Sequence, residues 1–249
     1  MKNIQTIDDV LHALDAIIVQ CHKDRSAIGY FACLYRKMTL AVKKGIDDGI
    51  FADATRMTRL DVIFAKRYLK AHELYIQKKQ PTRSWKVAFD ACQKNEITVI
   101  QHLLLGINAH INLDLGIAAA QTSLDKSIDT LEGDFNKIND IISSLVGEVQ
   151  NELTEIWFPM RFLDKISENW NAAVINFSIG IARQKAWDVA TSLAHLPSVQ
   201  HDVFIEHLDL KIEALALKIR NPSILKRMYL TMLKWTELSD VRQIIDILK

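Results

Sequence analysis

Residues that interrupt helices are scarce in this sequence, which has only 8 glycines and 4 prolines among 249 residues. A sheet protein needs turn residues every few positions, and nowhere does the chain show the strict polar–apolar alternation of a half-buried strand. Apolar residues recur instead at helical spacing. We therefore predict an all-α fold, a single-domain bundle of about eight to ten helices over residues 1–249. The alternative is a looser C-terminal subregion over residues 198–249.

Three other absences bear on location and partners. The formal net charge is only +1, so no strong field favours nucleic acid or an anionic membrane. The 3 cysteines are scattered and odd in number, which is typical of a reducing cytoplasm. The sequence shows no secretory signal and no uninterrupted apolar run of about 18 residues that would predict a membrane span. We expect a soluble, cytoplasmic protein that binds neither nucleic acid nor membranes.

Signatures of known chemistry are also missing. The sequence has no glycine-rich phosphate loop, no Gly-x-Ser-x-Gly nucleophile elbow and no His-Glu-x-x-His metal motif. No cofactor and no oligomeric state is indicated. Function therefore has to be sought among polar residues on apolar helix faces.

One long apolar stretch, residues 97–120, predicts a central and buried helix, ITVIQHLLLGINAHINLDLGIAAA. On a helical wheel its polar residues fall on two nearly opposite lines, and the flanks between them are apolar. One line carries Gln101, Asn108 and Asn112, and the other carries His110 and Asp114. Because unpaired buried polar groups are costly, these side chains must find partners inside the protein.

Two other predicted helices carry polar residues on apolar faces and could supply those partners. Asp61 and His72 share a stripe on the helix after Asp53, and Arg67 lies beside it. Arg183 and Trp187 lie four apart on the helix before Pro197, where they could stack. Since a buried carboxylate should be paired, Asp114 needs a cation. We expect Arg183 to supply it, or Arg67 if the topology differs.

The helix boundaries and one core face can also be predicted. Thr6 with Asp9 indicates a capping box, and Asp53, Ser84 and Ser239 are expected N-caps. Gly45 and Gly49 should end the second helix, and Asn95 should precede the central one. Over residues 127–156 apolar residues alternate spacings of three and four, which predicts a buried heptad seam. Its central members are Phe135, Ile138, Ile142, Leu145 and Val149.

The polar cluster has three interpretations. His110 and Asp114 could both reach one metal ion, but two ligands do not make a site. Buried histidines and carboxylates can also serve as general acids and bases in a pocket. The same residues can form a hydrogen-bonded network that fixes helix packing. An open cavity beside His110, Asp114 and Arg183 would favour the pocket, and a closed, fully paired cluster would favour packing.

Six stretches, in order along most of the chain, share a common resemblance. They are LDVIFAKRYLKA, SWKVAFDA, QHLLLGINAHINLDLGIAAA, LEGDFNKIN, FSIGIARQKAW and SDVRQIIDIL. Together they are similar to a bacterial family catalogued as domain of unknown function 5995. The family has no established activity, so the resemblance implies one unit over most of the chain and assigns no catalytic residue.

From the sequence we expect a helical bundle whose buried polar residues mainly specify packing. The alternative is an enzyme or small-molecule binder with a polar pocket around the central helix, with metal-assisted hydrolysis as one form of its chemistry. The candidate pocket or network residues are Asp61, Arg67, His72, Gln101, Asn108, His110, Asn112, Asp114, Arg183 and Trp187.

Overall fold

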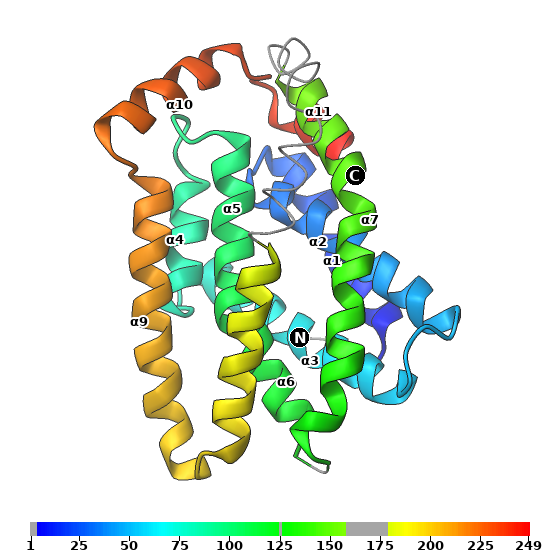
Figure 1. The fold of residues 1–249 in the computed structure, drawn as a ribbon. Helices are drawn as coiled ribbons and strands as arrows, with labels where there is room; N and C mark the ends of the chain where they lie inside the picture. Colours follow the sequence, from blue (N-terminus) through cyan, green and yellow to red (C-terminus); the bar gives the residue numbers. More distant parts are fainter. Residues whose placement is uncertain (1–3, 125, 158–178) are drawn as a thin grey trace.

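The computed structural model describes residues 4–124, 126–157 and 179–249, and its fold is all-α. Helices surround a central helical column that includes α5 (Figure 1). Within the described ranges no strand forms, and the one β-type contact is an isolated bridge between Trp157 and Glu237. The all-α prediction is confirmed.

The first three helices form much of one side of the molecule. They are α1 (Ile7–Asp24), α2 (Ile28–Asp47) and α3 (Ala54–Ile76). The predicted capping box of Thr6 and Asp9 starts α1, and the Asp53 carboxylate caps α3 by accepting from the Arg56 N–H.

Gly45 does not end α2, which continues through it to Asp47. A glycine lowers helix stability by about 1 kcal/mol relative to alanine, and buried packing outweighs that cost. Gly45 is buried against Ile141 and Phe51, and both would crowd a Cβ added at this position.

The central helix runs without a break from Val99 to Thr122 but changes its winding in the middle. It comprises α5 (Val99–Ala109), a π-helical stretch (His110–Leu115) and α6 (Gly116–Thr122). Its N-terminus is set by a capping box of Thr98 and Gln101, so Asn95 precedes the helix as predicted but does not cap it. π-helical turns inside α-helices are rare and often mark functional sites.

The central helix also bears on the expectation that no segment spans a membrane. By length and apolar composition alone, Val99–Thr122 is long and apolar enough to cross one. However, 78% of its most apolar window is buried inside the fold. That burial agrees with the predicted central core helix.

Helix α4 (Arg83–Ala91) packs against α9 (His201–Arg220) and α5. Ser84 was expected to cap α4, but the N-cap is Thr82 and makes no side-chain hydrogen bond. The buried Asp209 carboxylate of α9 caps α4 instead, because it accepts hydrogen bonds from the backbone N–H groups of Arg83 and Ser84 at 2.6 and 3.0 Å. A distant acidic residue thereby satisfies the first turn of α4.

Helix α7 (Glu132–Ile156) follows a short 3₁₀ turn (Ile128–Leu131). Its predicted seam is only partly buried: Phe135 and Ile142 are buried, whereas Ile138, Leu145 and Val149 are half-buried. The physical reason is a cavity, described below, that all four aliphatic seam residues line. The helix predicted before Pro197 is described over residues 179–195.

The C-terminal part contains a 3₁₀ turn (Ser198–Gln200) before α9, then α10 (Ile224–Thr236) and α11 (Val241–Leu248). Asp240, and not the expected Ser239, caps α11 by accepting from the Arg242 N–H. Buried residues of α9 and α11 belong to the same hydrophobic cluster as those of α1 to α5. The residues in question are Ala216, Ile244, Ile245 and Leu248.

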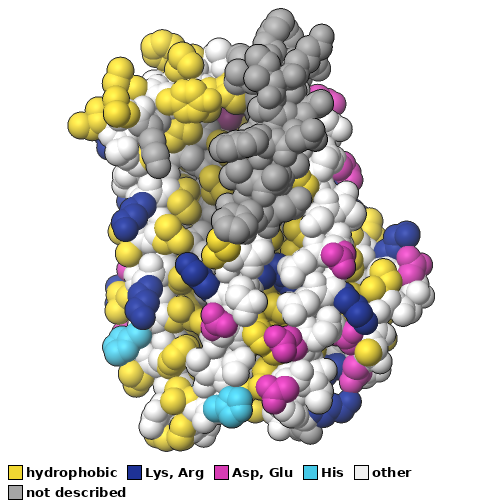
Figure 2. Space-filling model, viewed as in Figure 1, with side chains coloured by type: hydrophobic (Ala, Val, Ile, Leu, Met, Phe, Trp, Pro, Cys, Tyr) yellow, Lys and Arg dark blue, Asp and Glu magenta, His cyan; other side chains and the backbone are white. Residues whose placement is uncertain are grey.

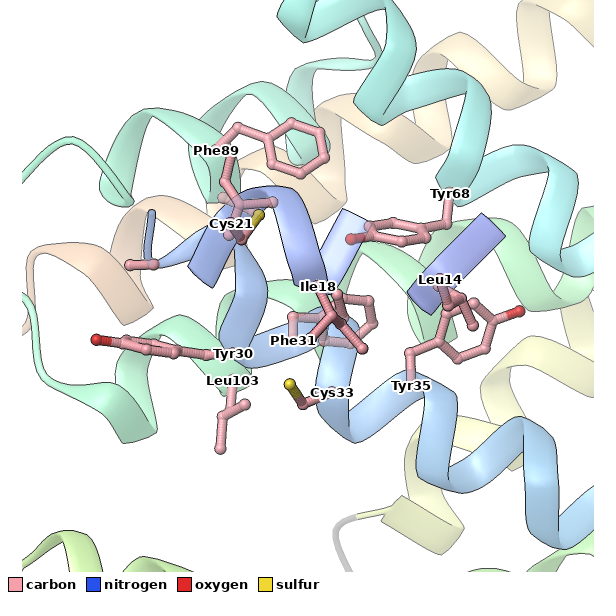
Figure 3. Close-up of a cluster of buried hydrophobic side chains, with 14 of the residues drawn as sticks. Leu14, Ile18, Cys21, Tyr30, Phe31, Cys33, Tyr35, Tyr68, Phe89 and Leu103 are labelled. Carbon is pink, nitrogen blue, oxygen red and sulfur yellow. The ribbon is translucent and has the colours of Figure 1, made fainter. Parts of the chain in front are cut away.

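Aromatic rings occupy much of that cluster. Figure 3 shows Phe31 and Tyr35 of α2 close to Tyr68 of α3. The ring centroid of Tyr68 lies 5.4 Å from that of Phe31 and 5.7 Å from that of Tyr35, with edge-on geometry in both pairs. Such pairs add about 0.5–1.5 kcal/mol each beyond the area they bury. The same three rings pack edge-on against His110 of the central helix.

Candidate functional site

The Asp114 carboxylate lies at the centre of a buried polar cluster. It is 1% exposed and accepts from Arg67 Nε and Trp85 Nε1, each at 2.7 Å. Burial alone would raise the pKa of Asp114, but the Arg67 charge, His110 and the Trp85 N–H together hold it below its usual value. Asp114 is therefore an ionised and well-paired carboxylate.

Arg67 is thus the cation that Asp114 requires, and the first choice, Arg183, was wrong. Arg67 lies on α3, which packs directly against the π-helical stretch. Arg183 instead donates to Asn139 Oδ1 at 2.5 Å and to the Phe135 carbonyl at 2.6 Å, both on α7. Its guanidinium also lies 4.4 Å from the centre of the Phe135 ring, so the stacking expected with Trp187 is made with Phe135.

His110, one turn before Asp114, is held as a neutral imidazole. Its Nδ1 lies 3.5 Å from Asp114 Oδ2, and its ring stacks on Phe64 with centroids 3.6 Å apart. Complete burial lowers the pKa of His110, and the neighbouring Asp114 only partly opposes this. When Nδ1–H faces Asp114, the other ring nitrogen carries a lone pair. That atom, Nε2, has no hydrogen-bond partner among the described residues.

A cavity of about 430 Å³ lies beside His110. Its wall comes from α2, α3, the central helix, α7, α9 and the segment 179–195, and it is overwhelmingly apolar. Aliphatic members of this wall include Leu34, Leu60, Leu103, Ile107, Ile111, Leu115, Ile142, Leu145, Val149 and Leu215. This volume lies in the range of small-molecule pockets, which are largely apolar with a few placed polar groups.

Four polar atoms of cavity-lining residues are buried and have no hydrogen-bond partner within the described part of the chain. They are Tyr35 Oη, Thr39 Oγ1, Asp61 Oδ2 and His110 Nε2, and of these only the Tyr35 and Thr39 hydroxyl groups are near enough to each other for a weak contact. Most native proteins leave few such atoms, and each requires an explanation. Burial raises the pKa of Asp61 to about 7, so this carboxyl group carries a proton below that pH.

Arg183 adds a positive charge to the cavity wall. It is 3% exposed, and burial lowers the pKa of its guanidinium to about 10, so it remains charged at neutral pH. Within the described ranges its hydrogen-bond acceptors are the neutral oxygens of Asn139 and Phe135. An unpaired buried charge costs several kcal/mol, roughly, unless an anion compensates it.

The remaining predicted residues lie elsewhere or have structural roles. Gln101 and Asn108 donate to the backbone carbonyls of Ile219 and Ile212 on α9, at 2.9 and 3.1 Å. Asn112 donates to Asn108 Oδ1 at 2.9 Å, so the predicted polar line does share one face. Asn108 and Asn112 also reach the cavity wall.

His72 and Trp187 are not part of the cavity wall. His72 packs edge-on against Phe89 at 6.2 Å, and burial lowers its pKa. Trp187 packs on Phe135 at 5.0 Å. Among the residues that the structure describes, no group of three or more His, Cys, Asp or Glu side chains is arranged to hold a metal ion.

Sequence reasoning missed Tyr35, Thr39 and Trp85. Tyr35 and Thr39 lie four apart on α2, on a face with apolar neighbours, and this spacing was the available signal. Trp85 was not singled out, although a buried indole N–H usually needs an acceptor. Nothing in its local sequence pointed to Asp114, which is 29 positions away.

Comparison with known proteins gives one match. Neither a curated protein nor a solved structure matches the sequence. A family model described as Family of unknown function (DUF5995) matches residues 7–222, a span that contains the cavity, Asp114 and Arg183. The chain therefore belongs to this family of unknown function.

Proposed function

We propose that the protein binds a small, largely apolar molecule in the cavity beside His110. The observation that carries this proposal is the set of four unpaired polar atoms on cavity-lining residues. A network that only specified packing would pair its own members, as Asp114 does with Arg67 and Trp85. A bound polar group would supply the missing hydrogen bonds.

The residues that line the cavity indicate the chemical properties of this ligand. The aliphatic side chains match an apolar body, and hydroxyl groups and protonated Asp61 can donate to a ligand oxygen. Neutral His110 offers an acceptor at Nε2. Arg183 favours an acidic ligand over a basic one, because a ligand carboxylate would compensate its charge. A medium-chain carboxylic acid is the simplest molecule of this kind.

The test uses two tyrosines whose hydroxyl groups are both buried and unpaired in the described structure. Tyr35 lines the cavity, and Tyr68 does not. Replacing either with phenylalanine removes only an unpaired hydroxyl, so both variants should be at least as stable as wild type. Decanoic acid, decanol and decylamine should be compared by thermal shift. Decanoic acid should stabilise wild type and Tyr68→Phe most, and Tyr35→Phe less. Equal shifts for the two variants would oppose the proposal.

A second function, general base catalysis, is favoured by one specific observation. A buried carboxylate holds Nδ1 of His110, while Nε2 is left without a partner. In such a pair the imidazole can take a proton from an attacking water, and the carboxylate stabilises the resulting cation. The 3.5 Å separation is long for a hydrogen bond, although such contacts often tighten when substrate binds.

Hydrolysis of 4-nitrophenyl decanoate tests this second function. Wild type should release nitrophenol faster than His110→Gln, with a rate that falls as His110 becomes protonated at low pH. The Tyr68→Phe variant is the control and should retain the wild-type rate. Equal rates for wild type and His110→Gln would remove catalysis and leave binding as the proposed function.

We also propose a soluble, cytoplasmic location and no nucleic-acid partner. The three cysteines are free, and the most apolar helix is mostly buried in the fold. Both features support the proposal. Cell fractionation tests it, because recovery only after detergent extraction would contradict a soluble protein.

A further inference from the structure

Helix α10 presents an apolar face to solvent. Leu225 is 81% exposed and Trp235 is 82% exposed. Six large hydrophobic residues of this helix are more than half exposed: Ile224, Leu225, Met228, Tyr229, Met232 and Trp235. Figure 2 shows hydrophobic side chains gathered at the upper left, where Figure 1 places α10.

The spacing of these residues makes a continuous stripe. Ile224, Met228 and Met232 are four apart, and Leu225 and Tyr229 repeat the same step beside them. Residues at this spacing lie on one face of a helix. A soluble protein normally turns such a face inward, yet Leu233 is the one buried hydrophobic residue of α10. Exposed apolar patches of this extent mark interaction sites.

The charged residues in the sequence around the stripe are all basic. Residues 214–236 contain five basic residues and no acidic ones. The basic residues are Lys218, Arg220, Lys226, Arg227 and Lys234. Lys234 is paired with Glu237 at 2.6 Å, whereas Arg227 is exposed. The rest of the chain contains the other 26 basic residues and all 30 acidic residues. The net charge of +1 therefore conceals a strongly basic region around α10.

We propose that α10 docks on an anionic lipid surface. An interfacial helix combines an apolar face rich in Trp and Leu with a polar face rich in Lys and Arg, and it lies in the headgroup plane. Tyr229 and Trp235 supply aromatic rings that favour that depth. Charge argues against a second copy as the occupant, because pairing residues 214–236 of two copies would bring ten basic residues together. This peripheral contact requires no membrane span and does not depend on the cavity, but it departs from the expectation, drawn from the overall net charge, that the protein binds no membrane.

Sedimentation of the full chain with lipid vesicles tests the proposal. The vesicles contain either phosphatidylcholine alone or equal parts of phosphatidylcholine and phosphatidylglycerol. Wild type should sediment with the anionic vesicles, remain in solution with the uncharged ones, and be released by high salt. Leu225→Glu and Arg227→Glu should each weaken binding by about tenfold or more. Both side chains are exposed, so both variants should fold normally.

Two substitutions at other exposed positions are matched controls. Val199 is 83% exposed and precedes α9, so it lies at the end of that helix opposite α10. Val199→Glu and Lys211→Glu should sediment like wild type. No sedimentation of wild type with anionic vesicles, equal sedimentation with uncharged ones, or unchanged binding of Leu225→Glu would overturn the proposal. A dimer in sedimentation velocity that Leu225→Glu dissociates, without vesicle binding, would assign the surface to a second copy instead.

Discussion

Replacing Asp61 with asparagine should make the protein more stable at neutral and alkaline pH. Burial raises the pKa of this carboxyl group from 3.8 to about 7 in the folded chain. The unfolded chain ionises near pH 4, roughly, whereas the folded chain keeps the proton until about pH 7. Stability is therefore lost as pH rises between these two values, and the loss is complete above the higher one. At about 1.36 kcal/mol per pKa unit, the full penalty is about 4 kcal/mol.

Asparagine cannot ionise, so it removes this penalty while it keeps the size of the side chain. Urea unfolding followed by circular dichroism should show Asp61→Asn more stable than wild type by up to about 4 kcal/mol near pH 8, and equal to it near pH 4. Asp114→Asn is the opposite control. The pKa of Asp114 is lowered in the folded chain, so its ionised form adds stability that the variant lacks at neutral pH. A pH-independent difference between Asp61→Asn and wild type would refute the argument.

Two further predictions concern packing around the central helix. Asp114→Ala should lower the free energy of unfolding by on the order of 3–5 kcal/mol, because it leaves the Arg67 charge without its partner. Urea unfolding measures this cost, and a value below about 1 kcal/mol would mean that the pair does not stabilise the fold. Gly106→Ala should cost roughly 1–3 kcal/mol, because its Cβ would lie 2.3 Å from the Phe31 ring. Gly147→Ala on α7 is the matched control and should stabilise by up to about 1 kcal/mol, since nothing lies within 4 Å of its added Cβ. Thermal melts that rank these two glycine variants the other way would contradict the packing of α5 on α2.

Helical periodicity was enough to predict the fold class and the central helix, because apolar spacing records which face is buried. Helical periodicity could not predict how deeply each residue of that face is buried. Leu145 and Val149 continue the same pattern as Ile142 and line the same cavity, yet they are half-buried and Ile142 is buried. A cavity is a property of the space between helices, and no single helix carries its signature.

For buried charges, the sequence predicted the type of partner but not which residue supplies it. Asp114 had to meet a cation, but the choice between Arg67 and Arg183 depends on which helix packs against the π-helical stretch. The spacing of apolar residues did not predict the π-helical stretch. Tyr35 and Thr39, which also belong to the candidate site, come from a helix on which their spacing of four residues was the only sign that the two hydroxyl groups share a face.

The most direct test of the central claim is calorimetric titration of decanoic acid into wild type and into Leu145→Trp. Leu145 lines the cavity from α7 and is half-buried, so a tryptophan there can extend into open space. The variant should keep or gain stability, since filling a cavity is generally favourable. The account predicts measurable binding to wild type and at least about a tenfold weaker affinity in the variant, because the added ring competes for the same volume. Equal affinities, or no binding to wild type with decanoic acid, decanol or decylamine, would contradict it.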